Sequence, residues 1–480
     1  MSSLKQLVRF PWRGQESDQW LASSRPKERF WRRLSPPQLF VGSFLLLILL
    51  GALGLKTLPG LYTGPSLSWL DALFTATSAV CVTGLIVVDT ATYFTPWGQA
   101  FLLLLIQLGG LGIITFTTVL IVALGRRLSL RQQALAVSIA EAAPYIDYRQ
   151  LARDVIRFTF LIEAIGALLL YIGFGPKLGW EAALWPAVFH AVSAFCNAGF
   201  SVFSDSLIGF RTDPLILIPV MLLIVTGGLG FLTLEELYLW RRSIQVRRRF
   251  RLSLHSRLVL LTTAVLLAVG SIFFAVFEWD VTLRTLPPEA KLLNGLFMSV
   301  TARTAGFNTI DYAQATEQTN FLTILLMFVG GSPGSTAGGI KTTTLALLVL
   351  LALSRLRGQE IPSCWSRSVP HEVVQRAVGL FVVAVAVLML ASFALTASEI
   401  EHGVSAPGGF LKYLFEAYSA FGTVGLSMGV TPSLTPTGRW IIILLMFIGR
   451  VGPLTFAAAL ALQRRRTRQF RYAYEDVVVG

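Results

Sequence analysis

The sequence predicts an all-α membrane protein of four parallel tandem units, each a helix, a re-entrant pore loop and a helix, around a pseudo-fourfold pore. Three observations support this class. Of the 480 residues, 54% are hydrophobic and 14% charged, whereas soluble domains have about 45–50% apolar and about 25% charged residues. Eight apolar stretches are long enough to cross a bilayer, and a short glycine motif occurs four times between them.

The eight predicted spans set the domain organisation. They cover residues 37–55, 97–124, 155–174, 214–239, 257–277, 320–354, 373–397 and 438–462. Shorter segments at 70–83, 183–197, 288–303 and 408–422 cannot cross a hydrocarbon layer of about 30 Å, so we expect re-entrant helices there. The predicted pore units are 37–124, 125–239, 240–354 and 355–462, between a basic N-terminal tail (1–36) and a C-terminal tail (463–480).

The basic residues indicate the orientation of the chain. With eight spans, the connections on the side of both termini carry 28 of the 40 Lys and Arg, and the opposite connections carry eight. The positive-inside rule therefore predicts a multi-pass protein of the cell membrane with both termini in the cytoplasm. Runs such as 247–249 and 464–466 are interpreted as topology signals, so we expect no nucleic-acid partner. The outer face is net acidic, which favours cations at the mouth.

Two sequence patterns recur in all four units. The pattern F-x3-S-A-x4-G begins at Phe74, Phe189 and Phe415, and a degenerate third copy has Leu296, Val300, Thr301 and Gly306 at these places. A second echo reads LGGLGIITF (108–116), TGGLGFLTL (226–234), VGGSPGSTAGGIKT (329–342) and IGRVGPLTF (448–456). Because every connection between units is basic, each unit begins and ends on the cytoplasmic side, and the repeats are parallel.

The first pattern predicts a cation filter. A short helix that descends from the outer surface directs its partially negative C-terminus towards the membrane centre. The chain then returns through an extended segment, whose free carbonyls are tolerated only beside a cavity. Four such loops would form a carbonyl ring like that of potassium-selective filters. The predicted ion-binding residues for K⁺ are Val82, Thr83, Gly84, Asn197, Ala198, Gly199, Thr304, Ala305, Gly306, Thr423, Val424 and Gly425.

The four glycines also have an alternative interpretation, which is close helix packing of the small-xxx-small kind. Cys81 and Cys196, three residues before their glycines, are expected to be buried side chains that support the filter. Arg303 occupies the same place in the third unit, and we expect it to point away from the pore because a cation there would repel the ion.

The third unit contains a predicted gate. Its helix-breaking stretch consists of Gly330, Gly331, Ser332, Pro333, Gly334, Ser335, Thr336, Ala337, Gly338, Gly339, Ile340 and Lys341. Proline and glycine would break a membrane helix here, and the opened backbone must lie beside a cavity. A movable plug is the resulting hypothesis. A phosphate-binding P-loop is disfavoured, because Ile340 separates Gly339 from Lys341 and no strand precedes the segment.

Arg450 is the second predicted gate element. It replaces the glycine found at this place in the other units and lies 11 residues after Arg439, about 16 Å along a helix. An arginine near the middle of a span costs about 2.5 to 3.5 kcal/mol. It either forms a buried ion pair within the bundle or places a positive charge below the filter that opposes cation passage.

These residues resemble the Trk/Ktr/HKT superfamily of potassium transporters from about 37 to 480. The resemblance lies in CVTGL, CNAGF, RTAGF and GTVGL, together with GGSPGSTAGGIK and Arg450, and is closest to the Ktr membrane subunit. It implies K⁺ uptake, often promoted by Na⁺, by a homodimer in which each chain has its own pore. It also implies a cytosolic ring of nucleotide-binding regulatory subunits of the KtrA type. The C-terminal EDVVVG (475–480) resembles the segment that supports the family's dimer.

The predicted function is therefore a channel-like K⁺ uptake permease, regulated by a cytosolic nucleotide-binding subunit and surrounded by membrane lipid. The alternatives are a coupled cation symporter, which requires an intramembrane acid or histidine relay, and the membrane subunit of an ATP-driven pump. Glu163 is the best intramembrane acid, and pairing at a helix interface, with Arg157 as a candidate partner, explains it more simply. We expect no enzyme activity, no structural metal and no cofactor on this chain, since neither a nucleophile–base pair nor a metal-ligand cluster is evident.

Overall fold

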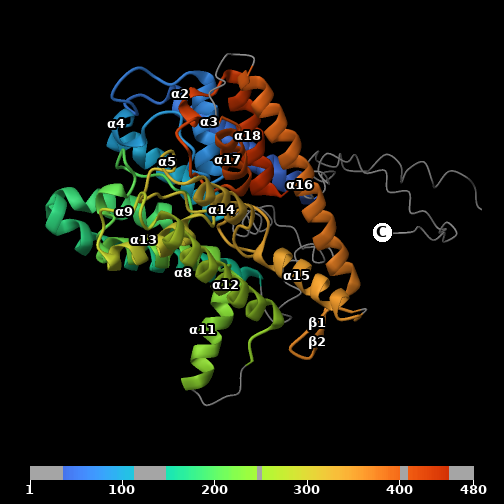
Figure 1. Ribbon diagram of the computed structural model, residues 1–480. Coiled ribbons are helices and arrows are strands. Elements are labelled where there is room, and N and C mark those ends of the chain that lie inside the picture. Colours follow the sequence, from blue (N-terminus) through green and yellow to red (C-terminus); the bar gives the residue numbers. More distant parts are fainter. Residues whose placement is uncertain (1–35, 113–147, 246–250, 360, 401–408, 453–480) are drawn as a thin grey trace, which may run out of the picture.

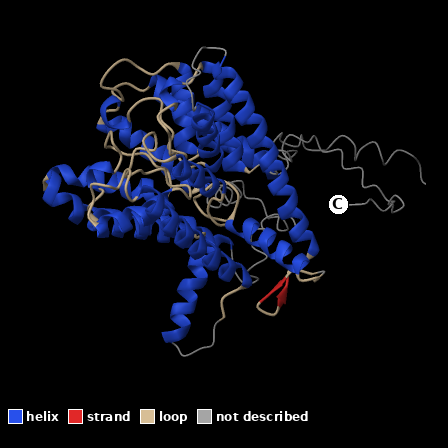
Figure 2. Cartoon of the chain, viewed as in Figure 1, coloured by secondary structure: helices blue, strands red, loops and turns tan. Residues whose placement is uncertain are grey.

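The structure is a computed structural model that describes residues 36–112, 148–245, 251–359, 361–400 and 409–452. Within these ranges the chain is mostly helical, with loops between the helices and one short two-stranded hairpin (Figure 2). The order of long helix, short helix, loop and second helix repeats four times along the chain. Both predicted tails, 1–36 and 463–480, lie outside the described residues except for Pro36.

The first helix of each unit is long and apolar. These helices are α2 (Pro36–Thr57), α8 (Tyr148–Leu178), α12 (Leu254–Glu278) and α16 (His371–Ile400). Each is long and apolar enough to cross a membrane, and the described residues contain a fifth such element if the bent pair α10–α11 is counted as one span. Only 22–28% of their apolar windows is buried inside the protein, as expected of helices that present leucine, isoleucine and valine to lipid.

The four short helices predicted from the first pattern are all present. They are α3 (Trp69–Val80), α9 (Trp180–Phe195), α13 (Pro288–Thr301) and α17 (Gly409–Gly422). We call them the pore helices. The phenylalanine that begins the first pattern is completely buried in three of them, at Phe74, Phe189 and Phe415, and the completely buried phenylalanine of the third pore helix is Phe297. The third copy is therefore not degenerate: Phe297, Thr301 and Ala302 form F-x3-T-A, followed by one residue fewer before Gly306 than in the other copies.

The second helix of each unit is short and ends at the second echo. These helices are α5 (Pro96–Gly110), α10 (Pro214–Gly228), α14 (Glu317–Phe328) and α18 (Pro436–Val451). A continuous span was expected over 214–239, and this was wrong: after Gly230, whose φ is +85°, the chain turns by 103° into α11 (Phe231–Gln245). The predicted break in the third unit is present, because α15 (Thr342–Leu356) follows α14 only after a loop.

Five small elements complete the described chain. They are α4 (Thr90–Tyr93), η3 (Ile208–Phe210), η4 (Thr431–Ser433), β1 (Ser363–Cys364) and β2 (Arg367–Ser368). The two strands form an antiparallel hairpin between α15 and α16 (Figure 1). This hairpin is the only departure from the predicted all-α class among the described residues.

Polar contacts join the first helix to the second in three units. In the second unit, Lys177 at the end of α8 forms an ion pair with Asp213, which precedes α10. In the third unit, Glu278 accepts hydrogen bonds from the backbone N–H and hydroxyl of Thr316, both at 2.9 Å. Glu399 accepts the corresponding bonds from Thr435 in the fourth unit. Each bond anchors the start of a second helix, whose first N–H groups have no partner within the helix.

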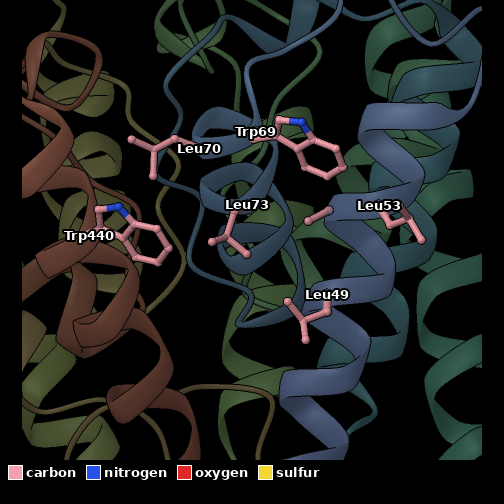
Figure 3. Close-up of a pocket in the computed structure, with 7 residues that line it drawn as sticks. Leu49, Leu53, Trp69, Leu70, Leu73 and Trp440 are labelled. Atoms are coloured by element: carbon pink, nitrogen blue, oxygen red, sulfur yellow. The ribbon is translucent and has the colours of Figure 1, made fainter.

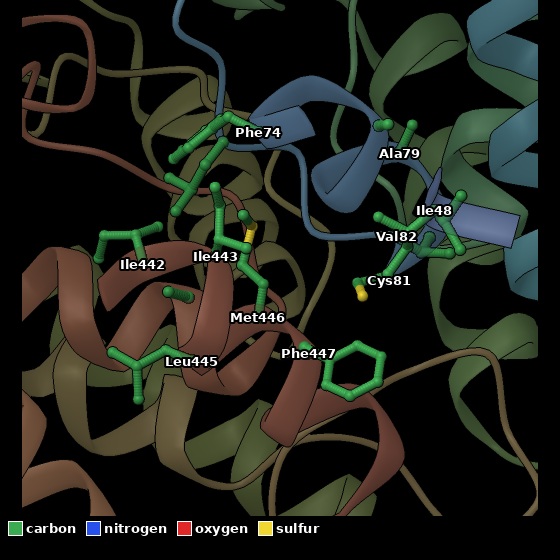
Figure 4. Packing of buried hydrophobic residues seen from close by; sticks show 14 of the residues in the cluster. Ile48, Phe74, Ala79, Cys81, Val82, Ile442, Ile443, Leu445, Met446 and Phe447 are labelled. Carbon is green, nitrogen blue, oxygen red and sulfur yellow. The ribbon is translucent and has the colours of Figure 1, made fainter. Parts of the chain in front are cut away.

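The helices of successive units pack in a cycle. The second helix of each unit contacts the pore helix of the next: α5 contacts α9, α10 contacts α13, α14 contacts α17, and α18 contacts α3. The last contact joins the two ends of the described chain, where α18 lies beside α3 in Figure 1. Figure 4 shows this junction, with Ile442, Ile443 and Met446 packed in the same buried cluster as Phe74 and Val82.

Candidate functional site

One apolar groove in the described part of the chain is distinct from the candidate ion site. A groove of about 540 Å³ lies between α2, α3 and α18 and is lined only by apolar residues and tryptophan: Leu49, Ala52, Leu53, Trp69, Leu70, Leu73 and Trp440 (Figure 3). These side chains offer a cation no oxygen ligand, and their character suits contact with lipid. The loops that follow the pore helices contain the oxygen-rich region instead.

The four loops share an unusual backbone conformation. One residue in each has a positive φ although it is not glycine, and the glycine of the first pattern lies two residues further on with φ also positive. The non-glycine residues are Val82 (+55°), Asn197 (+60°), Thr304 (+76°) and Thr423 (+50°). The glycines are Gly84 (+91°), Gly199 (+69°), Gly306 (+80°) and Gly425 (+94°). Such angles are outliers for β-branched residues, so their fourfold occurrence shows that the loops are equivalent.

The four glycines form a closed ring. A Cβ placed on Gly84 would collide with the carbonyl oxygen of Ala198, one residue before Gly199. A Cβ on Gly199 would lie 2.8 Å from the carbonyl oxygen of Ala305. The same relation leads from Gly306 to Val424 O and from Gly425 back to Thr83 O. Each loop therefore places the carbonyl that precedes its glycine against the glycine of the loop before it.

Side-chain oxygens without partners gather around this ring. Four buried oxygens at the start of the loops have no hydrogen-bond partner in the described part of the chain: the hydroxyls of Thr83, Thr304 and Thr423 and the Oδ1 of Asn197. Buried polar atoms are normally paired. Unpaired oxygens one or two residues from the ring glycines are candidate ligands for a cation that has lost its water.

A hydroxyl on each pore helix fixes the loop that follows. The backbone N–H of Gly84 donates to Ser78 Oγ at 3.1 Å, and Gly425 donates to Ser419 Oγ at the same distance. Ser193 Oγ donates to the carbonyl of Phe200 at 2.8 Å. Thr301 Oγ1 donates to the carbonyl of Phe307 at 2.6 Å, which confirms that Thr301 has the role of serine in the third copy.

The glycines of the second echo have a packing role. A Cβ on Gly109, Gly227 or Gly449 would overlap the carbonyl oxygen of the last pore-helix turn in the same unit, at Val80, Phe195 and Phe421 respectively. Close approach of two backbones requires glycine. Small-residue helix packing, the alternative considered for the filter glycines, therefore explains the second echo.

The loop 330–341, which we call the loop segment, contacts the ends of several helices. Its Ser332 N–H donates to the carbonyl of Gly228 at 2.9 Å, and its Thr336 N–H donates to that of Gly227 at 3.2 Å. These carbonyls belong to the last turn of α10, where helix carbonyls lack partners within the helix. A Cβ on Gly338 would collide with Thr423, one of the positive-φ residues. The loop segment thus lies directly against the loop that contains Thr423 and Gly425.

Thr336 is the centre of these contacts, and no feature of the sequence distinguishes it from its neighbours in the loop segment. Its hydroxyl donates towards Phe195 O at 3.1 Å and Gly227 O at 3.0 Å. The same hydroxyl accepts from Asn197 Nδ2 at 2.8 Å. One side chain therefore connects the loop segment to the C-terminus of α9, to α10 and to the loop that contains Asn197.

Arg450 binds the loop segment. Its guanidinium, completely buried within α18, donates to the carbonyl oxygen of Thr336 and, at 2.6 Å, to that of Gly109. Among the described residues, the two carboxylate ion pairs involve Lys177 and Arg439, so the buried ion pair considered as an alternative for Arg450 is not present there. Arg450 thus connects the first unit to the loop segment through backbone carbonyls.

Two further cations bind carbonyls of the loop segment, one from within the segment and one from outside it. Lys341 donates through Nζ to the carbonyl of Ala337 at 2.6 Å. Arg303 is buried, and its guanidinium donates to the carbonyl of Gly330 at 3.3 Å. The side chain of Arg303 therefore reaches into the loop segment, an arrangement that the sequence did not predict.

Glu163 pairs at a helix interface, as expected, but with different partners. Gln107 on α5 donates to its carboxylate at 3.1 Å, and Cys196 lies within sulfur hydrogen-bond distance of both Gln107 and Glu163. Cys81 and Cys196 are both buried free thiols, as predicted. The contacts found for Glu163 do not include Arg157, so the candidate partner was wrong.

Comparison with known proteins places this arrangement in a family. The model of the TrkH family, described as a cation transport protein, matches residues 45–469. The Ktr system potassium uptake protein B of Bacillus subtilis is 40% identical over 93% of this chain and 96% of its own length. The potassium/sodium uptake protein NtpJ of Enterococcus hirae is 38% identical over 95% of this chain and 99% of its own length.

A solved structure has the same fold. The crystal structure of the potassium transporter TrkH from Vibrio parahaemolyticus superposes with a TM-score of 0.66 at 19% identity, covering 92% of this chain and 88% of that one. The identity with Ktr proteins over nearly the whole chain carries the assignment beyond the fold. The chain belongs to the TrkH family of cation transport proteins, within the Ktr/Trk group of potassium transporters.

Proposed function

We propose that the chain is the ion-translocating subunit of a channel-like K⁺ uptake permease. The observation that carries this proposal is the closed ring in which each filter glycine faces the carbonyl of the next loop. Carbonyls held in this way replace the water shell of an ion. The pore helices add to the effect, because their C-termini, which are partially negative, precede the loops. The K⁺ sites would be formed by residues 82–84, 197–199, 304–306 and 423–425, around a pseudo-fourfold axis.

The loop segment and Arg450 form the proposed gate. The loop segment satisfies carbonyls at the ends of α9 and α10, where a cation would otherwise be attracted. Arg450 holds the loop segment to α5 through two carbonyls, Thr336 O and Gly109 O. In this closed state both the backbone and the positive charge oppose passage, and opening requires that the bonds of Arg450 to the loop segment break.

Topology and assembly are part of the proposal. We propose eight crossings, with both termini in the cytoplasm of a cell that carries the protein in its plasma or inner membrane. We also propose a homodimer and activation by Na⁺. Relatives named as parts of a Ktr system support a further, regulatory subunit, for which we propose a cytosolic nucleotide-binding protein of the KtrA type. A relative named as a potassium/sodium uptake protein supports an involvement of Na⁺.

Growth of a bacterial strain that lacks K⁺ uptake systems tests the proposal. The parent chain, expressed with a Ktr-type regulator, should restore growth at low external K⁺. Gly306→Ser should abolish this rescue at equal membrane abundance, because the new Cβ would collide with Val424 O. Equal rescue by the parent and the variant would contradict the filter, and no rescue by the parent would contradict K⁺ uptake.

A further inference from the structure

The pore-helix residue that follows the buried phenylalanine differs among the four units. It is Thr75, His190, Met298 and Glu416 in chain order. The side chains of His190 and Glu416 have no exposed surface. Both are polar groups inside the protein that neither the carbonyl ring nor the loop segment uses, so their burial calls for another explanation.

Glu416 binds the segment that follows the ring glycine in its own unit. We call the segment after each ring glycine the arm of that loop. Its carboxylate accepts a hydrogen bond from the hydroxyl of Ser427 and another from that of Thr431 at 3.0 Å. The backbone N–H groups of Met428 and Val430 also donate to it. Ser427 lies two residues after Gly425, so one carboxylate fixes the backbone that leaves the ring.

His190 makes the corresponding contact in the second unit. Its Nε2 lies 2.9 Å from Ser201 Oγ, two residues after Gly199. Its Nδ1 lies 2.8 Å from the carbonyl of Pro186. A carbonyl can only accept, so Nδ1 donates and Nε2 of the neutral ring accepts from Ser201.

The two arms also share an internal hydrogen bond. Ser201 Oγ accepts from the backbone N–H of Phe203 at 3.0 Å, and Ser427 Oγ accepts from that of Gly429 at 2.9 Å. In each case the donor lies four residues after the filter glycine. The second and fourth units therefore contain the same three-part arrangement of pore-helix side chain, serine and backbone N–H.

The first and third units lack this arrangement. The hydroxyl of Thr75 has no hydrogen-bond partner in the described part of the chain, and Ile86 stands where the serine would be. Met298 and Asn308 occupy the two places in the third unit. Since the units follow one another around the ring, the held loops alternate with loops that are not held in this way.

We propose that Glu416 and His190 are positioning residues for ion selectivity, which hold two opposite filter loops from behind. This inference rests on the proposed filter and extends it. A carbonyl ring discriminates between cations only while its oxygens keep their spacing. Glu416, with four donors, makes the larger contribution. Buried side chains of the pore helices thus hold two of the four loops, in the second and fourth units, so the support of the ring has twofold rather than fourfold symmetry.

The test measures K⁺ flux and Na⁺ flux into liposomes, each per folded molecule, and compares their ratio among variants. Glu416→Ala should lower this ratio about tenfold and Ser427→Ala about threefold, since each removes hydrogen bonds from the arm. Glu416→Gln keeps one acceptor oxygen and should fall between the parent and Glu416→Ala. The matched control Thr75→Val removes a hydroxyl without a partner at the same pore-helix position and should leave the ratio unchanged.

Two results would overturn the inference. One is a parental flux ratio in folded Glu416→Ala or, if that variant does not accumulate, in Ser427→Ala. The other is a fall in thermal stability with an unchanged ratio, which would show a purely structural role. Gly425→Ser, measured in parallel, separates the two proposals. An unchanged flux ratio in this variant refutes the filter itself. A flux ratio that falls in Gly425→Ser but stays parental in Glu416→Ala refutes only the support by Glu416.

Discussion

Serine substitutions at the ring glycines should reduce K⁺ preference by unequal amounts. Gly425 has φ +94°, and a Cβ there would collide with the carbonyl oxygen of Thr83. Gly199 has φ +69° and its nearest atom, Ala305 O, lies 2.8 Å away. The latter angle is close to the left-handed region near +57° that other residues sometimes adopt. Gly425→Ser should therefore be the more damaging variant and Gly199→Ser the milder one.

The expected magnitude follows from the strain. A residue other than glycine at such a φ costs about 1 to 3 kcal/mol, and relief of the collision requires the Thr83 carbonyl to move. Since each 1.4 kcal/mol is tenfold in an equilibrium constant, a loss of about tenfold or more in K⁺ over Na⁺ preference is expected for Gly425→Ser. The assay is competitive uptake of labelled K⁺ and Na⁺ into liposomes that contain the purified protein.

Gly60→Ser is the matched control. Gly60 has φ +75°, similar to the ring glycines, but no atom lies within 4 Å of the position of its Cβ. The variant should lower thermal stability to a similar degree through backbone strain while ion preference remains parental. The reasoning would be refuted if Gly60→Ser altered preference as much as Gly425→Ser, or if Gly199→Ser proved the more damaging of the ring variants.

Four further predictions concern the gate. Shortening the loop segment within 332–339 should raise K⁺ flux without changing ion preference; a folded deletion with parental flux would show that the segment is no plug. Arg450→Ala should raise K⁺ flux about tenfold, because hydrogen bonds from a charged donor contribute about 1.5 to 3 kcal/mol. Arg450→Lys should also raise it, since one ammonium replaces a guanidinium that bonds Thr336 O and Gly109 O; a parental Lys variant would favour a pure charge barrier. Thr336→Val keeps the volume of the side chain but removes the hydroxyl that holds the loop segment, so K⁺ flux should increase. Lower flux at parental thermal stability would contradict the role of Thr336 in closure.

Local patterns predicted the elements that local physics determines. The expected helix at 288–303 is found at Pro288–Thr301, because apolar spacing and the proline at its start act within a few residues. The equivalence of the four ring glycines was also evident from sequence, since their positive φ values leave few alternatives to glycine. Both signals are contained in short windows, and the repetition in four units made them specific.

The third copy shows where pattern matching failed. Counted back from Gly306 at the spacing of the other copies, the pattern predicts Leu296 at the place of the buried phenylalanines, whereas the structure buries Phe297 completely. The turn between pore helix and glycine is one residue shorter in this unit, and a fixed spacing cannot accommodate the change. The threonine that replaces the serine was the signal that could have revealed it.

The partners of Arg450 and Thr336 could not be predicted. Both side chains bind backbone carbonyls, and a carbonyl occurs at every residue, so the sequence contains no mark that selects Gly109 or Phe195. The bend after α10 had a weak signal in Gly230, but glycine in an apolar stretch fits a straight membrane helix equally well. Long-range packing decided these features.

The central claim is that the ring of four glycine loops is a K⁺ filter, and one measurement tests it most directly. Purified protein in liposomes, without its regulator and with the loop segment shortened to open the path, is given gradients of K⁺ and Na⁺ that are equal in size and opposite in direction, and the voltage at zero net current is recorded. The filter predicts a voltage close to the K⁺ equilibrium potential, shifted towards that of Na⁺ in Gly425→Ser. A voltage midway between the two potentials in the unsubstituted ring, or an identical voltage in Gly425→Ser, would contradict the claim.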